Sequence, residues 1–405
     1  MRQTLLASAM ALAIAAPLHA KTIDVAAGDR AQQRLQEALI LAQPGDVVNL
    51  GAGRFSLTDG LSLDVNSVIV RGAGMEATVL DFTGQQGGGE GLLVTSDDVS
   101  LRDFAVENSK GDGIKSKGAD RIVYYRVRVE WTGGPKETNG AYGIYPVEST
   151  GVLIDSVRVM GASDAGIYVG QSKDITIRYS VAEGNVAGIE IENSRNALVS
   201  GNYVTRNTGG ILVFDLPALP VMGGGNVIVS DNLVIGNDTP NFAPKGNIVA
   251  SVRRGTGIMV MANDNVQIVG NHLDANPTAQ VMVITYPLPF TDQRYNPSPR
   301  DIVVASNRFK RGGYDPQLPG AAALLAAFGG SLPPVLWDGL GEAPKAFGTG
   351  NSNAWSLNLP KQGASPEVAR PAPIKLPDLV ATPPRPGFQL PRAGAPEALD
   401  ARLIS

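Results

Sequence analysis

The stretch Gly188-Ile189-Glu190-Ile191-Glu192-Asn193 decides the fold, because its opening Gly–apolar pair recurs along the whole chain. The recurring pairs are Gly91-Leu92, Gly113-Ile114, Gly143-Ile144, Gly166-Ile167, Gly188-Ile189, Gly210-Ile211 and Gly257-Ile258. Successive pairs are separated by 22, 30, 23, 22, 22 and 47 residues, and the longest interval spans two periods. A fixed period of this size is the sequence signature of a solenoid, whose repeats stack and share one core.

The inside of one repeat indicates strands rather than helices. Ile189 and Ile191 alternate with Glu190 and Glu192, and polar residues and glycines follow before the next apolar run. Short alternating runs bounded by Gly, Asn and Ser are typical of strands with one buried face. No part of the repeat has helical spacing, which argues against leucine-rich and ankyrin repeats. Three short strands per turn, wound with the usual right-handed crossover, predict an all-β, single-stranded, right-handed parallel β-helix.

Aligned repeats form columns of equivalent residues. The apolar columns are Val152/Ile154, Ile175/Ile177, Ala197/Val199, Val227/Val229, Val266/Ile268 and Ile302/Val304. Two asparagine columns contain Asn202, Asn232, Asn271 and Asn307, and Asn185, Asn207, Asn237 and Asn276. Stacked asparagine side chains can hydrogen-bond along the axis of a stacked β structure. We expect both columns to be structural, because Asn in a repeated turn needs no functional explanation.

The start of the chain adds a family resemblance. Residues 33–42 form an amphipathic stretch, and Pro44-Gly45-Asp46 and Gly51-Ala52-Gly53-Arg54-Phe55 follow it. With the repeats, this opening resembles right-handed β-helix proteins of the pectate-lyase-like superfamily, over about residues 22–310. The resemblance implies an N-terminal helix that covers the open end of the core and its sheet edge. It implies no particular activity, since one fold hosts many functions.

The two ends of the chain suggest the domain organisation. Residues 1–20 have an early cation, Arg2, and an apolar run too short to span a membrane, so we expect a cleavable signal peptide and no membrane anchor. This predicts a periplasmic or secreted protein. The β-helix is expected over residues 21–320 and a C-terminal cap over 321–359. The Pro-rich tail, residues 360–405, is expected to be disordered or an extended strap, and unable to pair as a strand.

Composition excludes several classes of function. The 405 residues include no cysteine, so there is no disulfide, thiolate metal site or attached haem. The formal net charge of −4 gives no basic stripe for nucleic acid. Beyond the leader, His272 is the single histidine, which excludes metal sites built from several histidines.

The outward residue after each Gly–Ile pair gives a candidate site. That column contains Lys115, Tyr145, Tyr168, Glu190, Leu212 and Met259, and two positions further it contains Lys117, Val147, Gly170, Glu192, Phe214 and Met261. Coils stack about 4.8 Å apart, so these side chains would share one sheet face. Tyrosine rings, lysines and carboxylates in one stripe suit an oligosaccharide. The alternative is that they are ordinary solvated sheet residues.

From this stripe we assign candidate roles. The candidate catalytic residues are Lys115, Tyr145 and Glu190, with Lys115 or Tyr145 abstracting a proton next to a uronate carboxylate. The candidate substrate-binding residues are Lys117, Trp131, Tyr142, Glu148, Asp164, Tyr168 and Glu192. The Glu190/Glu192 pair could act as acid and base. It could equally be a solvated acidic patch, or hold a cation with Asp215; the sequence identifies no certain cofactor, and calcium is the ion these ligands suit.

Four insertions interrupt the repeat at residues 130–142, 215–225, 238–254 and 286–300. Long insertions in a solenoid gather on one face, which is often the binding face. We therefore expect them to surround the stripe, with the first one forming a wall beside it.

Further resemblances lead to competing functions. The stretch from Tyr142 to Val147 is similar to the Tyr-Gly-Phe-Asp-Pro-His segment of mannuronan C5-epimerases, but Tyr145 and Val147 replace its aspartate and histidine. The chain also resembles exported two-section β-helix proteins encoded beside a dihaem cytochrome, and more distantly the maturation factors of periplasmic copper enzymes. The first resemblance implies an acidic polysaccharide that is bound and modified by a lyase- or epimerase-type reaction. The others imply a non-catalytic accessory protein that docks a redox or maturation partner.

A flat apolar face made by Leu212, Phe214, Met259 and Met261 would favour the partner protein. A cluster of carboxylate, lysine and tyrosine groups around an open groove would favour the polysaccharide. A purely structural solenoid is the third possibility.

Overall fold

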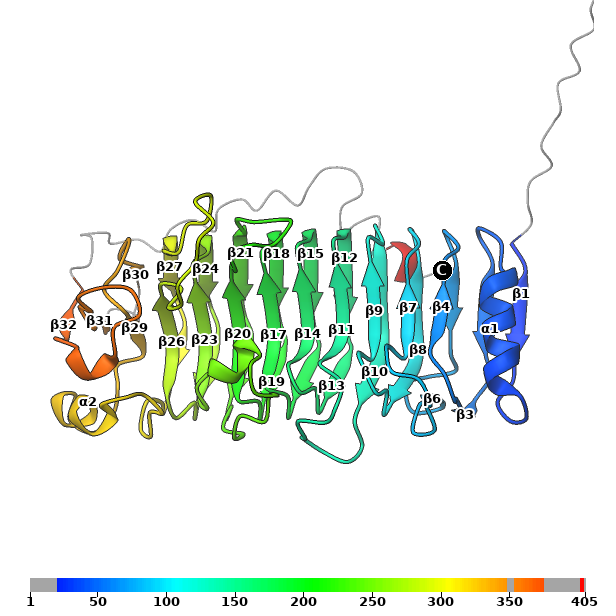
Figure 1. Ribbon diagram of the computed structural model, residues 1–405, viewed down its shortest axis with the longest axis horizontal. Coiled ribbons are helices and arrows are strands. Elements are labelled where there is room, and N and C mark those ends of the chain that lie inside the picture. The colour runs from blue at the N-terminus through cyan, green and yellow to red at the C-terminus, as the bar shows by residue number, and fades with distance from the viewer. Residues whose placement is uncertain (1–19, 348–352, 375–400, 404–405) are drawn as a thin grey trace, which may run out of the picture.

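The computed structural model describes residues 20–347, 353–374 and 401–403. Almost all of the predicted signal peptide and residues 375–400 of the predicted tail therefore lie outside the described residues. The described chain is one long right-handed coil of parallel strands (Figure 1).

Two sheets form the walls of the coil. The 12-stranded sheet consists of β4 (Leu61–Leu63), β7 (Leu92–Val94), β9 (Ile114–Lys117), β11 (Tyr142–Val147), β14 (Ala165–Gly170), β17 (Ala187–Glu192), β20 (Gly209–Phe214), β23 (Thr256–Met261), β26 (Ala279–Ile284), β29 (Val335–Trp337), β31 (Ala354–Ser356) and β32 (Ala372–Pro373). These strands follow one another along the axis in sequence order.

The other 20 strands form a second sheet that makes the remaining two sides of the coil. They are β1 (Thr22–Val25), β2 (Val47–Leu50), β3 (Gly53–Ser56), β5 (Ile69–Arg71), β6 (Thr78–Asp81), β8 (Ser100–Glu107), β10 (Ile122–Glu130), β12 (Thr150–Asp155), β13 (Arg158–Met160), β15 (Lys173–Arg178), β16 (Val181–Glu183), β18 (Arg195–Ser200), β19 (Tyr203–Thr205), β21 (Gly225–Ser230), β22 (Leu233–Ile235), β24 (Asp264–Val269), β25 (His272–Asp274), β27 (Arg300–Ala305), β28 (Arg308–Phe309) and β30 (Lys345–Phe347).

The glycine column has a steric cause. A Cβ atom on Gly113 would lie 2.6 Å from the carbonyl oxygen of Gly143 and 2.3 Å from a methyl group of Val129. A Cβ atom on Gly143 would meet Gly166 and Val159 in the same way. At these corners consecutive coils approach too closely for any side chain, so glycine recurs once per turn.

The register of the strands confirms the aligned columns. Val152 pairs with Ile175, Ile175 with Ala197 and Ala197 with Val227, and the apolar column continues to Ile302. These side chains are fully buried and form the continuous core of the coil. Most of the stability of the coil therefore comes from apolar burial shared between neighbouring turns.

Both asparagine columns form hydrogen-bonded ladders. The Asn202 amide donates to Asn232 Oδ1 at 2.9 Å, Asn232 to Asn271 at 2.9 Å, and Asn271 to Asn307 at 3.0 Å. Asn207 donates to Asn237 at 2.9 Å in the second column. Each buried amide also donates to a backbone carbonyl, as Asn232 does to Val199 at 2.9 Å. The prediction of structural ladders is confirmed, and the bonds satisfy polar groups that are wholly buried.

The N-terminal end of the coil matches the prediction, and the C-terminal end is longer than predicted. Helix α1 (Ala31–Leu41) covers the open N-terminal end of the core (Figure 1). At the other end, α2 (Ala321–Ala327) is followed by β29 and β31, which continue the 12-stranded sheet beyond residue 320. No helix among the described residues is long and apolar enough to cross a membrane.

The first part of the Pro-rich tail pairs as a strand, contrary to the sequence prediction. β32 lies antiparallel to β31, with Ala372 opposite Ser356. Proline itself cannot donate, but the flanking amides of Arg370 and Ile374 donate to Leu357 O at 2.8 Å and Ala354 O at 3.0 Å. An edge strand needs only alternate donors, so proline is tolerated there.

Candidate functional site

The predicted stripe lies on the outer face of the 12-stranded sheet, in the expected register. Lys115 pairs with Tyr145, Tyr168 with Glu190, and Glu190 with Leu212. The stripe is not uniform, however. Its N-terminal part is accessible, its middle part consists of buried acids, and its C-terminal part is apolar and covered by loops.

Lys115 is at the accessible part of the stripe. Its ammonium lies 3.0 Å from Glu90 Oε1, 3.8 Å from Asp112 Oδ2 and 4.9 Å from the centre of the Tyr145 ring. Burial raises the pKa of Asp112 to about 6, although the charge of Lys115 and the Tyr142 amide oppose the shift. We call Glu90, Asp112, Lys115 and Tyr145 the open site. It combines a cation with a carboxyl group that titrates near neutrality.

Three tyrosines pack together beside the open site. The ring centres of Tyr142 and Tyr145 are 4.5 Å apart, as are those of Tyr142 and Tyr168, and Tyr145 and Tyr168 are 4.9 Å apart. We call them the tyrosine cluster. Tyr168 is buried, whereas Tyr142 and Tyr145 remain partly exposed. Burial, followed by the nearby Asp112, raises the pKa of Tyr145 to about 12, so its hydroxyl is protonated at neutral pH.

Three carboxyl groups lie under the tyrosines and form the acid cluster: Asp164, Glu190 and Glu192. Burial and the neighbouring Glu192 raise the pKa of Asp164 to about 7, and burial raises the pKa of Glu192 to about 7 against a hydrogen bond from Tyr168. Burial, Asp164 and Glu192 raise the pKa of Glu190 well above its ordinary value. No lysine or arginine of the described residues pairs with these groups. Each of these carboxyl groups therefore keeps its proton to a higher pH than a solvated carboxyl group does.

Insertions cover the acid cluster, so the reading of Glu190 and Glu192 as a solvated acidic patch is wrong. Glu190 is 2% exposed and Glu192 is 7% exposed. Apolar residues from the insertions at 215–225, 238–254 and 286–300 pack over the sheet beside these acids. They include Met222, Phe242, Val249, Tyr286 and Tyr295. The insertions do gather on one face, but they close over its middle instead of leaving a groove.

The predicted calcium ligands do not converge. The Asp215 carboxylate accepts hydrogen bonds from the Gly224 backbone amide at 2.6 Å and from the Asn263 side-chain amide at 2.8 Å. These bonds anchor the insertion that begins at Asp215. Within residues 20–347, 353–374 and 401–403, no three His, Cys, Asp or Glu side chains are arranged to hold a metal ion. Glu190, Glu192 and Asp215 thus do not fit calcium, and Asp215 acts as a loop anchor.

The remaining candidates have different positions. Lys117 is exposed at the end of β9, and Glu148 is exposed in the turn that follows β11. Trp131 is 5% exposed and part of the main core, where its indole donates to Ser109 O at 2.7 Å. Trp131 is therefore a structural residue and not a surface for substrate, because its ring fills the base of the first insertion.

The predicted flat apolar docking face is absent. Leu212, Phe214 and Met261 are buried, and Met259 is only partly exposed. The same three insertions that cover the acid cluster cover these side chains. A partner protein therefore has no flat apolar surface to dock on at this position.

The comparisons with known proteins agree with this architecture. The sequence family described as "Right handed beta helix region" matches residues 66–218. The chain therefore has the right-handed β-helix fold. A search of curated protein sequences finds no significant match.

Several solved β-helix proteins resemble the chain in structure. The A-module of the Azotobacter vinelandii mannuronan C-5 epimerase AlgE6 is 19% identical, with a TM-score of 0.48 over 80% of this chain and 93% of the module. The AlgE4 A-module is 17% identical, with a TM-score of 0.46 over 71% and 85%. An alginate lyase from Paenibacillus sp. str. FPU-7 is 17% identical, with a TM-score of 0.37 over 73% and 96%. At this level the likeness concerns the fold.

Sequence reasoning missed two residues of the open site, Glu90 and Asp112. The sequence alignment considered residues after each Gly–apolar pair, whereas Glu90 and Asp112 come directly before Gly91 and Gly113. Aligning the position before each Gly–apolar pair would have placed Glu90, Asp112 and Tyr142 in one column, because each directly precedes the glycine of its repeat.

Proposed function

We propose that this β-helix protein binds an acidic polysaccharide at the open site and transfers protons at a uronate residue, as a lyase or an epimerase does. One observation carries the proposal. A lysine ammonium, a carboxyl group with a pKa of about 6 and a protonated tyrosine lie together on a rigid sheet. Perturbed groups of this kind cluster at functional sites, and a sheet holds them in fixed geometry.

Lys115 supplies the positive charge for the substrate carboxylate. An ammonium has three N–H donors, and among the described residues Glu90 is the carboxylate within hydrogen-bond distance. Donors therefore remain for a uronate. Lys117 is two residues further along the same strand, about 7 Å away, and exposed, so it can meet the next sugar of an acidic chain.

Asp112 is the candidate base. Above a pH of about 6 its carboxylate is ionised and can accept the proton from the carbon next to the uronate carboxylate. As that C–H bond breaks, its electron pair delocalises into the carboxylate, where Lys115 offsets the growing negative charge. This assignment differs from the sequence prediction, in which Lys115 or Tyr145 accepted the proton.

Tyr145 is the candidate acid, because its hydroxyl keeps its proton at neutral pH. Proton transfer from Tyr145 to the opposite face of the same carbon would invert the configuration of that carbon, as in an epimerase. Proton transfer to the glycosidic oxygen, with cleavage of the C–O bond, would give an unsaturated sugar. In both cases the phenolate regains a proton from water, and Asp112 loses the one that it accepted.

The acid cluster positions the tyrosines in this proposal. The Tyr142 hydroxyl points to Asp164 Oδ2 at 3.5 Å, and Glu192 interacts with the Tyr168 hydroxyl. Because Tyr142 and Tyr168 both contact the Tyr145 ring, they hold its orientation. Export of the protein remains part of the proposal, since it depends on the composition of residues 1–20.

The test is proton exchange on uronate oligomers in D2O, followed by NMR, together with the ultraviolet absorbance of unsaturated products. Wild type is expected to exchange or cleave at least one of polymannuronate, polyguluronate and polygalacturonate. Asp112→Asn and Tyr145→Phe should lower the rate at least 100-fold. Tyr179→Phe is the matched control, because Tyr179 is 66% exposed and lies outside the site.

Two results would refute the proposal. One is that wild type acts on none of these polymers. The other is that D112N and Y145F act as fast as Y179F.

A further inference from the structure

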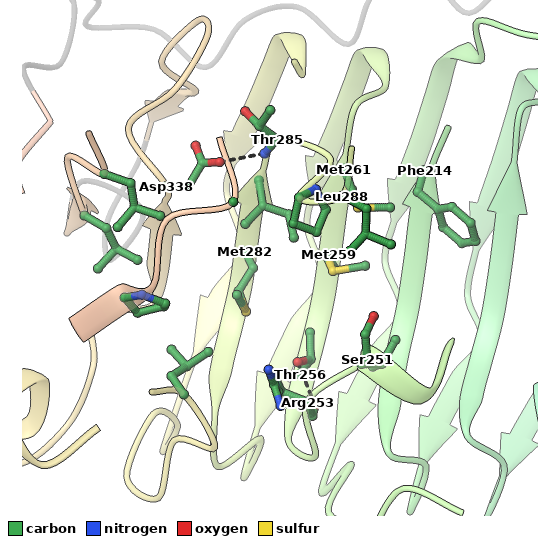
Figure 2. A pocket seen from close by; sticks show the side chains of 18 of the residues that line it. Phe214, Ser251, Arg253, Thr256, Met259, Met261, Met282, Thr285, Leu288 and Asp338 are labelled. Atoms are coloured by element: carbon green, nitrogen blue, oxygen red, sulfur yellow. Dashed lines mark hydrogen bonds between the residues drawn. The ribbon is translucent and has the colours of Figure 1, made fainter. Parts of the chain in front are cut away.

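A cavity of about 390 Å³ lies beyond Glu190 on the outer face of the same sheet. Its floor consists of outward side chains from β20, β23 and β26, with Phe214, Met259 and Met282 among them (Figure 2). Pockets for small molecules are of this size and are mostly apolar with a few polar groups. We call it the apolar cavity.

Three separate segments build the walls of the apolar cavity. The 3-10 helix η1 (Ile248–Ser251) forms one side, and Leu288 of the insertion at 286–300 forms another. The chain between Leu357 and Pro366 closes the C-terminal side. Apolar side chains from distant parts of the sequence thus surround a space that their own packing leaves open. Methionine side chains on the floor can adapt to a flexible ligand.

Besides Glu190, two ionisable residues line the cavity, Asp338 and Arg253, and they lie at different places. Asp338 already accepts hydrogen bonds from the Thr285 amide at 2.6 Å and the Leu340 amide at 2.9 Å. Arg253 lies on another side, beside Ser251 and Thr256, and Met282 and Met259 lie between it and Asp338 (Figure 2). In the described part of the chain, no carboxylate pairs with the Arg253 guanidinium, whereas the neighbouring Arg254 pairs with Asp238 and Asp315. Arg253 is therefore available to an anion.

We propose that the apolar cavity binds an amphipathic anion, whose hydrocarbon chain lies on the methionine floor and whose carboxylate or phosphate head pairs with Arg253. A guanidinium presents a planar fork of donors that matches either head group. Glu190, which is 2% exposed, is also among the residues that line the cavity. This inference does not depend on the proposed function, since Arg253 and the methionines are outside the open site.

The experiment is a calorimetric titration of the folded protein with octanoate, decanoate and dodecanoate, all below their micelle concentrations. Dodecyl phosphate tests the other head group. Affinity should rise up to about fourfold for each added methylene group. Dodecyltrimethylammonium carries the same chain with the opposite charge and should bind at least tenfold more weakly than dodecanoate.

The variant Arg253→Met should weaken dodecanoate binding about tenfold at low salt, while the chain-length dependence stays. Arg294→Met is the matched control, because Arg294 is an exposed arginine on a neighbouring insertion and pairs with Asp292. Met259→Trp, which fills the cavity, should abolish binding while the circular dichroism spectrum stays that of wild type.

Three results would overturn the inference: no binding of any anion in the series, equal affinity for the cationic and anionic amphiphiles, or equal affinities of R253M and R294M. If dodecyl phosphate binds and dodecanoate does not, the inference holds with phosphate as the head group.

Discussion

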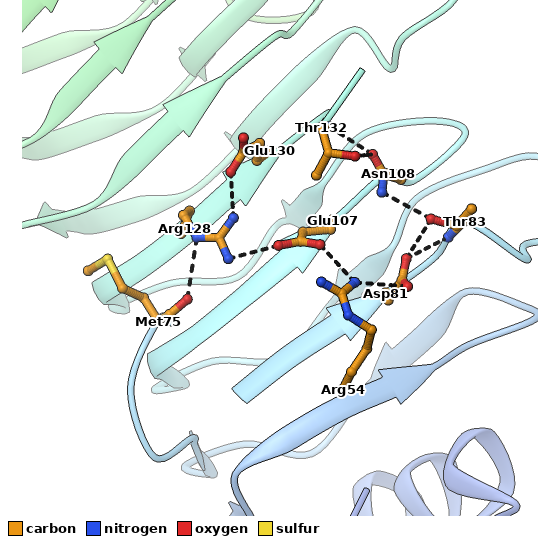
Figure 3. Close-up of polar contacts among 9 residues, drawn as sticks. All are labelled: Arg54, Met75, Asp81, Thr83, Glu107, Asn108, Arg128, Glu130 and Thr132. Atoms are coloured by element: carbon orange, nitrogen blue, oxygen red, sulfur yellow. Dashed lines mark hydrogen bonds and ion pairs between the residues drawn. The ribbon is translucent and has the colours of Figure 1, made fainter. Parts of the chain in front are cut away.

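Two clusters of buried carboxyl groups, one on each sheet, differ in their partners. On the 20-stranded sheet, Glu107 lies between Arg54 and Arg128, each with a nitrogen 2.8 Å from one of its oxygens (Figure 3). Arg54 also pairs with Asp81 at 2.8 Å, and Arg128 with Glu130. On the 12-stranded sheet, the acid cluster has tyrosines as neighbours and no cation among the described residues.

The difference appears in the pKa values. Burial alone would raise the pKa of Asp81, but hydrogen bonds from Thr83 and Arg54 outweigh it and hold that pKa below its ordinary value. Burial raises the pKa of Glu192 to about 7, because the single hydrogen bond from Tyr168 does not compensate. A paired cluster is thus a structural clamp between coils, whereas an unpaired one keeps protons available near neutral pH.

Breaking the paired cluster should have the largest effect. Arg128 has a 7% exposed side chain, and Arg128→Met would leave Glu107 buried with one partly exposed partner. Loss of one partner from a buried ion pair costs about 3–5 kcal/mol. We expect this decrease in the free energy of unfolding from urea denaturation. A decrease below about 1 kcal/mol, similar to that of the exposed-pair variant Lys345→Met, would show that the network is not a clamp.

One substitution made in both clusters sharpens the comparison. Glu107 is 4% exposed and Glu190 is 2% exposed, so Glu→Gln removes a buried charge-bearing group in each case. Glu107→Gln weakens two ion pairs and should cost about 2 kcal/mol at pH 8. Glu190→Gln removes an acid without a cationic partner and should leave the stability at pH 8 unchanged or higher. If urea denaturation shows an equal decrease in the free energy of unfolding for both variants, the presence or absence of cationic partners does not distinguish the two clusters.

The register and the sidedness of Glu190 and Glu192 follow from the sequence. The glycine at each corner fixes the length of a turn, and alternation assigns Glu190 and Glu192 to the outer face. The paths of the insertions do not follow, since residues 215–225 and 238–254 have no period that shows where they fold back. Burial of the acids, and with it their raised pKa values, depends on those paths.

Local rules also predicted two features wrongly. Proline content argued against a strand near Ala372, but at a sheet edge the amides of Arg370 and Ile374 suffice. Trp131 was assigned to substrate because it lies in an insertion, yet the ring of Trp131 folds into the core. Local composition decides neither the pairing of the strand near Ala372 nor the burial of Trp131. Both depend on which neighbouring coil packs against the segment.

The smallest expected effect is a pH dependence. The pKa of Glu192 is raised from 4.5 to about 7, so its contribution to stability is full below pH 4.5 and is lost as the pH rises through 7. Wild type should therefore lose stability between pH 5 and pH 8, and Glu192→Gln should lose less, by on the order of 1 kcal/mol. Urea denaturation at several pH values measures the free energy of unfolding of both proteins. If this free energy changes with pH in parallel for wild type and Glu192→Gln, the prediction is contradicted.

The most direct test of the central claim is a titration of the carboxyl carbons by NMR, on protein labelled with 13C at the side-chain carboxyl groups of Asp and Glu. Substitution of Glu192 and of Asp81 assigns the two signals. We predict a midpoint near 7 for Glu192 and a midpoint below 3.8 for Asp81. A midpoint for Glu192 at or below 4.5 would mean that its carboxyl group is solvated or paired, and would contradict the account.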